Sequence, residues 1–384
     1  MDWSNKRILV LDGGSRQCLP VLKGLHDIGC RITTVNESRL DNGYSSRYPD
    51  ERLLRGKGDP WAYILEQVKT GKYDALIPLS DASTDLVTRH LAELKPHVCI
   101  PVPEREVFLD AYNKQHTMEI CMDIGVPCPI TRRENETVDE AVRKIGFPLI
   151  AKPRMACGSV GLKIVRDRGQ LDRLLSSGEV PLDDYVLQEF IPQTGRQYNI
   201  HLFMDDERNL KSGLVTEKTR WFPVDGGASC LCRTIEDAKV LADCEKLIHT
   251  IGWRGYCEIE MIEDPRDGLF KVMEINGRAS ASIKIMQLAG MNVGQQMAEL
   301  AFGEEVTAFT CQRQDVRMRR IATDLLWLIK APDRFTRKPS WFSPVRTHEV
   351  VFSLADPKPF FASALSLVTH AMRYRQEMEA RSRN

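Results

Sequence analysis

The sequence predicts an α/β and α+β protein, in which a helix-covered parallel sheet is followed by a region of mixed strands. Over the first hundred residues, short apolar runs alternate with helical segments, a pattern typical of a parallel sheet. After a proline-rich break at residues 125–129, the strands alternate polar and apolar residues and the loops lengthen, which indicates mixed or antiparallel pairing. The 384 residues suffice for two or three domains, each with its own core.

Composition and charge exclude several classes of protein. The 53 Lys and Arg balance 53 Asp and Glu, which argues against nucleic acid as a partner, because binding phosphates requires a basic surplus. No apolar run approaches the roughly 18 residues of a membrane span, so no membrane is expected. The first residues do not read as a signal peptide, and the 11 cysteines show no disulfide or zinc spacing. We therefore expect a cytoplasmic protein with reduced cysteines.

The N-terminal elements follow in order along the chain. Strands are expected at 7–11, 31–35, 75–78 and 97–101, and helices at 18–28, 61–68 and 82–94. The carboxyl ends of the first three strands carry Gly13, Gly14, Ser15, Asn36, Glu37, Ser80 and Asp81. Such strand ends bind ligands in open α/β sheets. The glycine turn matches neither GxGxxG nor a P-loop, so it indicates either a plain tight turn or a site for a small polar substrate.

A helix is expected over 114–124. Further along the chain, an apolar strand carries a lysine near its end. The strand 147–153 delivers Lys152, a loop of small residues follows at 154–161, and a second strand occupies 162–165. Small residues let backbone N–H groups approach a polyphosphate, and the lysine supplies a point charge. A protein kinase has its glycine loop before the lysine and also HRD and DFG motifs, which are missing here. The alternative is a plain hairpin.

Two acidic strands give a stronger pattern. In 256–261 the side chains of Glu258 and Glu260 share one face, and in 270–276 those of Glu274 and Asn276 do the same. If the strands pair, oxygen ligands converge that suit Mg²⁺ bridging phosphates. Arg278 would then neutralise charge on a transferred phosphoryl group. The alternative is a solvated acidic face on a hairpin.

The chain also contains a basic strand and a charged C-terminal region. Lys218 and Arg220 alternate along the strand 217–223 and would grip phosphate or a carboxylate, with Arg233 as a weaker member of the group. The alternative is an exposed strand with ordinary charges. Toward the end, a helix at 322–330, a proline-rich stretch and a charged final helix are expected.

In their order and spacing, these motifs resemble the ATP-grasp superfamily and, within it, the carboxylate–amine ligases and the large chain of carbamoyl-phosphate synthase. The resemblance rests on Lys114, 149–153 with its loop, 186–192, Glu260 and 274–278, and it covers roughly residues 7–302. It implies a Rossmann-like pre-ATP-grasp domain at 1–110 and a small ATP-grasp subdomain at 111–185. A large subdomain at 186–305 and a C-terminal extension at 306–384 would follow.

The resemblance also implies residue roles. ATP would be bound by Lys114, Lys152, Ser159, Gly161, Gln188, Glu189, Phe190, Ile191 and Gln197, with 188–191 as the adenine hinge and 159–161 in the closing loop. The metal ligands would be Glu260, Glu274 and Asn276, where Glu260 is favoured over Glu258 because it directly precedes Met261. The catalytic residues would be Arg278, Lys218 and Arg220. Gln197 stands where many relatives carry Glu, and Gly277 stands where Pro is more usual.

The implied activity is ATP-dependent ligation. With ATP and Mg²⁺, for which Mn²⁺ is expected to substitute, the enzyme would activate a carboxylate as an acyl-phosphate and join it to an amine. A bicarbonate-using carboxylase or carbamoyl-phosphate-synthase-like enzyme is one alternative, and a non-catalytic nucleotide-binding module is another. A Rossmann oxidoreductase fits least, because the dinucleotide spacing is missing. The partners would be a small-molecule carboxylate and amine, and a homodimer is a further expectation; the sequence identifies neither substrate.

Overall fold

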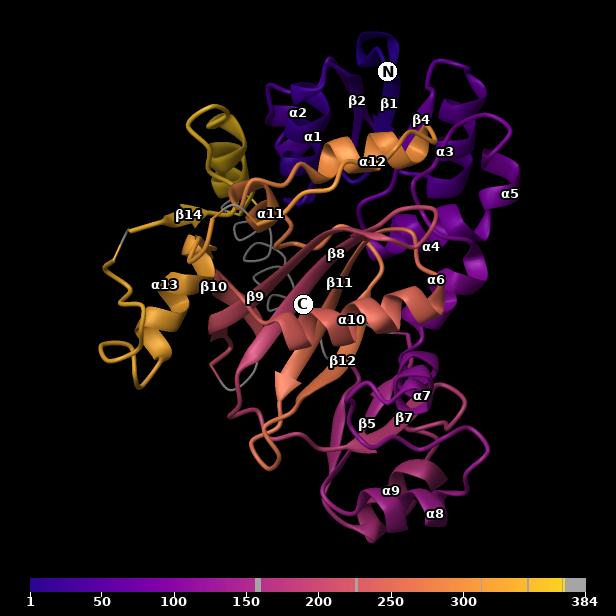
Figure 1. Cartoon of the computed structure of the whole chain (residues 1–384), viewed down its shortest axis with the longest axis vertical. Coiled ribbons are helices and arrows are strands. Elements are labelled where there is room, and N and C mark those ends of the chain that lie inside the picture. Colours follow the sequence, from indigo (N-terminus) through magenta and orange to yellow (C-terminus); the bar gives the residue numbers. More distant parts are fainter. Residues whose placement is uncertain (156–159, 225–226, 312, 344, 368, 370–384) are drawn as a thin grey trace, which may run out of the picture. The chain divides into compact units, whose positions relative to one another are not determined.

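A computed structural model divides the chain into two compact units (Figure 1). It describes residues 1–384 except 156–159, 225–226, 312, 344, 368 and 370–384. Unit 1 comprises Met1–Val102, Arg278–Thr307 and His348–Asn384, and unit 2 comprises Pro103–Gly277 and Ala308–Thr347. The mixed α/β architecture confirms the predicted fold class. Both units receive residues from the segment 306–384, so the compact units divide the chain differently from the four predicted domains, which stay a prediction.

Unit 1 contains a four-stranded parallel sheet in the order β3-β2-β1-β4. Its strands are β1 (Arg7–Val10), β2 (Arg31–Asn36), β3 (Glu51–Leu54) and β4 (Ala75–Ile77). Its helices are α1 (Cys18–Asp27), α2 (Asn42–Ser45), α3 (Pro60–Lys69), α4 (Asp81–Arg89), α5 (Leu91–Leu94), α11 (Lys284–Leu288) and α12 (Val293–Ala301), with a 3-10 turn at Trp3–Asn5. The predicted parallel sheet is therefore confirmed.

Unit 1 differs from its predicted elements in several places, and the helices α2, α11 and α12 were not predicted. Strand β3 was not predicted. The expected strand at 97–101 forms only a single bridge, between Cys99 and Ala75, because the chain runs beside β4 for one residue. The expected helix at 82–94 is two helices, since His90 leaves the helical conformation at φ −112° and ψ 23°.

Unit 2 combines a small and a large antiparallel sheet. The small sheet, in the order β6-β5-β7, consists of β5 (Leu149–Pro153), β6 (Lys163–Val165) and β7 (Tyr185–Glu189). The large sheet runs β12-β11-β8-β9-β10-β13, with β8 (Gln197–Met204), β9 (Leu210–Phe222), β10 (Ala228–Ile235), β11 (Gly255–Glu263), β12 (Phe270–Asn276) and β13 (Arg317–Arg319). The short strand β14 (Thr347–Glu349) follows β13 in this order, where the chain leaves unit 2.

The helices of unit 2 are α6 (Arg105–Tyr112), α7 (Lys114–Ile124), α8 (Val138–Ile145), α9 (Arg168–Ser176), α10 (Ala238–Ile251) and α13 (Ile321–Lys330). Helices α7 and α13 confirm the predicted helices at 114–124 and 322–330. The predicted final charged helix falls mostly on 370–384, outside the described residues. Throughout the described ranges, every helix is too short or too polar to cross a bilayer.

The core of unit 2 lies against one face of the large sheet. Alternate residues of β8 and β11, such as Ile200 and Ile259, pack with apolar residues of α6, α7 and α10, and α10 lies along this face (Figure 1). Because successive side chains of a strand point to opposite faces, the intervening residues of β8 and β11 point away from this core. Most of these intervening residues are polar, with Phe203 and Ile262 near the strand ends as exceptions, so the middle of the two strands presents a polar face opposite the core.

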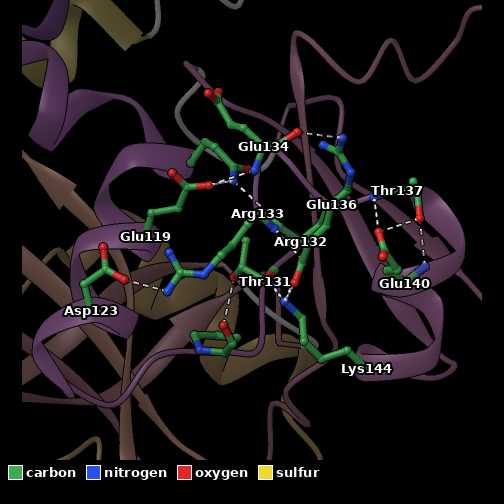
Figure 2. Close-up of polar contacts among 12 residues, drawn as sticks. Glu119, Asp123, Thr131, Arg132, Arg133, Glu134, Glu136, Thr137, Glu140 and Lys144 are labelled. Atoms are coloured by element: carbon green, nitrogen blue, oxygen red, sulfur yellow. Dashed lines mark hydrogen bonds and ion pairs between the residues drawn. The ribbon is translucent and has the colours of Figure 1, made fainter.

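A polar network connects α7 and α8 to the small sheet (Figure 2). Thr131 forms an isolated bridge with Gln188 of β7, and its carbonyl oxygen accepts a hydrogen bond from Lys144 Nζ at 3.0 Å. Lys144 also pairs with Glu136 at 2.7 Å, and Arg133 pairs with Asp123 of α7 at 2.6 Å. The segment 131–136 therefore fixes the strand that carries the predicted adenine hinge.

Gly277 packs directly against the fully buried side chain of Trp253. A Cβ atom at this position would lie 2.5 Å from Trp253 Cη2. Trp253 belongs to the core of the large sheet and has no solvent exposure, so its ring has no room to shift. The glycine is required here by close packing.

We predict that Gly277→Ala lowers the free energy of unfolding by about 1–3 kcal/mol, because the added methyl group overpacks the core. Urea denaturation measures the change. Gly58→Ala, where a Cβ meets no atom within 4 Å, is the matched control and is expected to leave stability nearly unchanged. Trp253→Phe should restore part of the loss in the double variant, because it removes the colliding ring atom. Equal stability of Gly277→Ala and the native chain would contradict this explanation.

Candidate active site

Four acidic and amide side chains meet on the polar face of the large sheet. Strands β11 and β12 pair so that Glu260 lies opposite Glu274 and Glu258 lies opposite Asn276. Asn276 Nδ2 is 3.4 Å from Glu260 Oε1 and 3.5 Å from Glu258 Oε1. Both predicted shared faces are confirmed, and their pairing brings the three predicted metal ligands together.

Three lysines from separate elements surround this cluster. Lys218 Nζ of β9 is 2.6 Å from Glu260 Oε2, and Lys114 Nζ at the start of α7 is 3.2 Å from Glu274 Oε2. Lys152 Nζ at the end of β5 donates a hydrogen bond to the carbonyl oxygen of Met273 at 3.3 Å. The lysines thereby balance carboxylates that would otherwise repel each other across the two strands.

Burial and neighbouring charges shift the pKa values of the cluster. Burial raises the pKa of Glu260, and the charges of Glu274 and Glu258 add to the effect. Burial opposes the charged form of Lys218, but the charge of Glu260 and its hydrogen bond outweigh this and raise the lysine's pKa. Burial lowers the pKa of Lys152 to about 8, which the charge of Glu274 only partly offsets. Lys152 is therefore a cation that titrates close to neutral pH.

Strand β8 adds two polar residues that the sequence analysis missed. Asn199 lies opposite Glu260, and His201 lies opposite Glu258. His201 Nδ1 is 2.7 Å from the Tyr256 hydroxyl, and burial lowers the pKa of the imidazole, so it is held neutral. Asn199 Oδ1 and His201 Nε2 are buried and have no hydrogen-bond partner among the described residues. The alternation of Gln197, Asn199 and His201 with apolar residues was the available signal.

The donor set fits a magnesium ion bound together with phosphates. Among the described residues, no three His, Cys, Asp or Glu side chains form a ready-made metal cage. Mg²⁺ is usually held by one or two carboxylates plus substrate phosphates, so such a cage is not required. Glu260 and Glu274 supply opposed carboxylates, and the unpartnered Oδ1 of Asn199 lies beside them in register. The side chain of Glu260 is 29% exposed and that of Glu258 only 4%, which favours Glu260 as the ligand that a metal could reach.

The predicted phosphate loop joins β5 to β6, and these strands confirm the two strands expected on either side of it. Ser159 lies outside the described residues. Gly161 has φ +77°, and a Cβ there would be 2.8 Å from Pro153 Cγ, so this position requires glycine. Beyond this requirement, a role in closing over phosphates stays a prediction.

The predicted hinge residues end β7, and their side chains are already engaged. Gln188 is fully buried and donates to Thr131 Oγ1 at 3.0 Å, while the Glu189 carboxylate pairs with Arg266 at 2.5 Å. Ile191 is buried and Phe190 is half-buried. Because the side chains of Gln188 and Glu189 already bind other residues of the protein, we expect the hinge to bind an adenine base through its backbone. Gln197 is buried on β8 opposite Lys218 and thus borders the lysine–carboxylate cluster.

Two predicted catalytic arginines are engaged elsewhere. Arg220 is buried and forms a two-pronged ion pair with Asp324 of α13, at 2.7 and 2.9 Å, while its guanidinium lies over the Trp327 ring. Arg278 belongs to unit 1, where its Nε is 3.2 Å from Asp81 Oδ2. Arg220 therefore anchors a helix instead of facing the carboxylate cluster, and catalytic roles for both arginines stay predictions.

We predict that Arg220→Ala lowers the free energy of unfolding by about 3–5 kcal/mol, because Asp324 is left buried without its partner. Denaturant unfolding measures the loss. The double variant Arg220→Met/Asp324→Leu removes both charges and should recover most of the stability. A double variant as unstable as Arg220→Ala would contradict this explanation.

Comparisons with known proteins agree with this geometry. Residues 111–282 match the family model of the ATP-grasp domain. D-aspartate ligase of Enterococcus faecium is 24% identical over 254 residues, which are 60% of this chain and 59% of that protein. The carbamoyl phosphate synthase large chain of Thermus thermophilus is 26% identical over 193 residues, or 47% of this chain and 18% of that protein. The chain thus spans less than two thirds of either relative.

Solved structures share the fold. The biotin carboxylase domain of Hydrogenobacter thermophilus 2-oxoglutarate carboxylase, in complex with MgADP, ADP and bicarbonate, aligns with TM-score 0.68 at 16% identity, covering 81% of this chain and 72% of that one. N5-carboxyaminoimidazole synthetase of Staphylococcus aureus aligns with TM-score 0.65 at 14% identity, covering 88% and 87%. The matched residues 111–282 contain the paired carboxylates and all three lysines of the cluster. The chain therefore contains an ATP-grasp domain, which confirms the resemblance predicted from its sequence.

Proposed function

We propose that this protein is an ATP-dependent ligase that joins a small-molecule carboxylate to an amine. The observation that carries the proposal is the apposition of Glu260 and Glu274 among three lysines, within the segment that matches the ATP-grasp domain. Opposed carboxylates and nearby cations are what phosphoryl transfer to an anionic acceptor requires, because like charges must be brought together.

The proposed reaction has two steps. An oxygen of the substrate carboxylate attacks the γ-phosphorus of ATP, the bond from this phosphorus to the β-phosphate oxygen breaks, and ADP leaves with an acyl-phosphate remaining. The amine nitrogen then attacks the acyl carbon, the phosphate leaves with the electron pair of its C–O bond, and the nitrogen loses a proton. Keeping water from the acyl-phosphate is the task assigned to the loop with Ser159 and Gly161.

The proposed roles follow from the positions of the residues. Glu260, Glu274 and Asn276 would hold Mg²⁺, for which Mn²⁺ is proposed to substitute, and this ion would offset phosphate charge. Lys114 and Lys152 would bind phosphates, and the backbone at 188–191 would receive adenine, with Gln197 beside it. Lys218 would stabilise the charge on the transferred group, a role also proposed for Arg220 and Arg278. Lys218 and Lys114 pair with carboxylates and Lys152 donates to a backbone carbonyl, so all three lysines already lie beside the proposed metal ligands.

The substrates are proposed only by class. The name of the E. faecium relative supports an amino acid as one of the pair. Bicarbonate is the competing acceptor, because one aligned biotin carboxylase structure contains it. We also propose that the protein is cytoplasmic and forms a homodimer. Sedimentation velocity measures the oligomeric state and tests the dimer.

The deciding assay measures Mg²⁺-dependent release of ADP and phosphate, with amino acids, other small carboxylic acids and bicarbonate added singly and in pairs. Turnover that requires a carboxylate and an amine together supports the ligase. Turnover with bicarbonate alone would replace the ligase by a carboxylase-like activity. Nucleotide binding without turnover across a wide metabolite panel would favour a non-catalytic nucleotide-binding module.

We predict that Glu274→Gln lowers ATP turnover by at least about 100-fold while the chain stays folded, because the substitution removes one opposed carboxylate. Steady-state ADP release measures the effect, and thermal unfolding checks the fold. Glu263→Gln is the matched control, since Glu263 lies at the end of the neighbouring strand β11 but pairs with Arg196. Full activity of Glu274→Gln would refute the metal assignment.

We also predict that the dissociation constant of MgADP rises above pH 8, by up to about tenfold per pH unit, because Lys152 loses its proton there. The sign follows from the lowered pKa, since the charged lysine predominates below about 8 and only this form attracts phosphate. Calorimetry between pH 7 and 9.5 gives the constants. In Lys152→Arg the cation does not titrate, so affinity should change little over this range. An identical rise in that variant would assign the effect to another group.

A further inference from the structure

Helix α13 is apolar on the side that faces water. Its inner side carries Asp324 and Trp327, which are buried against the sheet. The outward positions hold Ile321, Leu325, Leu326 and Ile329, with exposed fractions of 38%, 46%, 44% and 60%. Ala322 on the same side is also exposed. A water-facing helix normally has polar residues there, so this face is adapted to a different environment.

The segment around this helix is strongly basic. Residues 313–346 contain nine Lys and Arg but three Asp, a net charge of +6 in a chain whose total is zero. Each of the three aspartates is in an ion pair: Asp324 with Arg220, Asp333 with Arg337 and Asp315 with Arg317. Acidic side chains of the same segment therefore do not compensate the surplus, and this segment contains the apolar face of α13.

The stability of the helix does not by itself explain the basic and aromatic residues near its two ends. Arg320 stands at the N-cap, where the helix dipole disfavours positive charge. Lys330 is the last residue of the helix and Lys338 lies beyond it, and both are exposed. Phe335 and Phe342, which follow the helix in connecting loops, are 74% and 67% exposed. An apolar helical face with basic residues at both ends and exposed aromatic rings nearby is typical of segments that lie in a lipid headgroup layer.

We propose that the outer face of α13 with its flanking residues 313–346 binds an anionic lipid surface, with the helix lying in the plane of the headgroups. Lipid tails would cover Ile321, Leu325, Leu326 and Ile329, while lipid phosphates would attract Arg320, Lys330 and Lys338. A bilayer provides both an apolar layer and a sheet of negative charge, which complements each feature of this surface. This contact differs from a membrane span, which the helices of the described ranges are too short or too polar to form.

A second copy of the chain complements this surface poorly. Two-fold pairing through α13 would place the same basic surplus opposite itself, which like-charge repulsion opposes. An acidic polypeptide would match the charge, but it would have to supply a hollow for a convex row of helical side chains. Lipid is therefore the occupant that the charges and the apolar row favour together.

Co-sedimentation with vesicles of phosphatidylcholine and phosphatidylglycerol at 3:1 tests the proposal, with pure phosphatidylcholine vesicles as reference. The full chain should bind the anionic vesicles, lose binding in high salt and bind the neutral vesicles weakly. Leu325→Gln/Ile329→Gln should weaken binding by at least about tenfold, because two inserted side chains become polar. Lys330→Gln/Lys338→Gln should weaken binding to anionic vesicles only.

Matched controls lie in unit 1. Lys69→Gln/Lys72→Gln removes two exposed charges, and Leu354→Gln removes a leucine that is 89% exposed. Both should bind as the native chain does. Equal weakening by these controls would attribute binding to net charge or general apolarity and overturn the proposal. Absence of binding to anionic vesicles would overturn it as well, whether the chain then self-associates through α13 or binds an acidic protein. None of these readouts uses ATP turnover, so failure of the ligase proposal would not be mistaken for failure of this one.

Discussion

Two carboxylates that face each other across neighbouring strands impose the main electrostatic constraint on unit 2. Glu260 and Glu274 repel one another, and opposed like charges destabilise a sheet. Their backbones are nevertheless fixed, because the other face of β11 and β12 is locked into the core with α6, α7 and α10. The compensating cations come from α7, β5 and β9, which are far apart in sequence. Much of the fold of unit 2 thus serves to bring charges of opposite sign to one place.

Strand β9 links this cluster to a second charged contact. Lys218 faces the carboxylates, and two residues later Arg220 binds Asp324 of α13. If Lys218 takes part in phosphoryl transfer as proposed, the reacting group lies two residues along β9 from the residue that anchors α13. A protein that worked at a lipid surface would have its surface helix and its reactive centre joined by one short, rigid strand segment.

Much of this could be predicted from the sequence, and the exceptions have physical reasons. The alternation around Glu258 and Glu260 and around Glu274 and Asn276 predicted which side chains share a face. The motif order predicted that Lys114 and Lys152 would join them. Asn199 and His201 carried the same two-residue period but follow no recognised motif, so they were missed. The partner of Arg220 lies 104 residues away on another element, and local patterns contain no information on such a pair. Strand β3 was not predicted because Glu51–Leu54 lacks alternation and β-branched residues.

The close contact between Gly277 and Trp253 restricts how this chain can diverge. Any side chain at 277 meets the indole ring, so the two positions cannot vary independently. A lineage that replaces the glycine must first replace the tryptophan with a smaller residue, and it passes through a cavity-containing intermediate. The reverse order meets a steric barrier. Among relatives of this chain, a large aromatic residue at 253 and a glycine at 277 should therefore be inherited together, as a linked pair that marks one branch of descent.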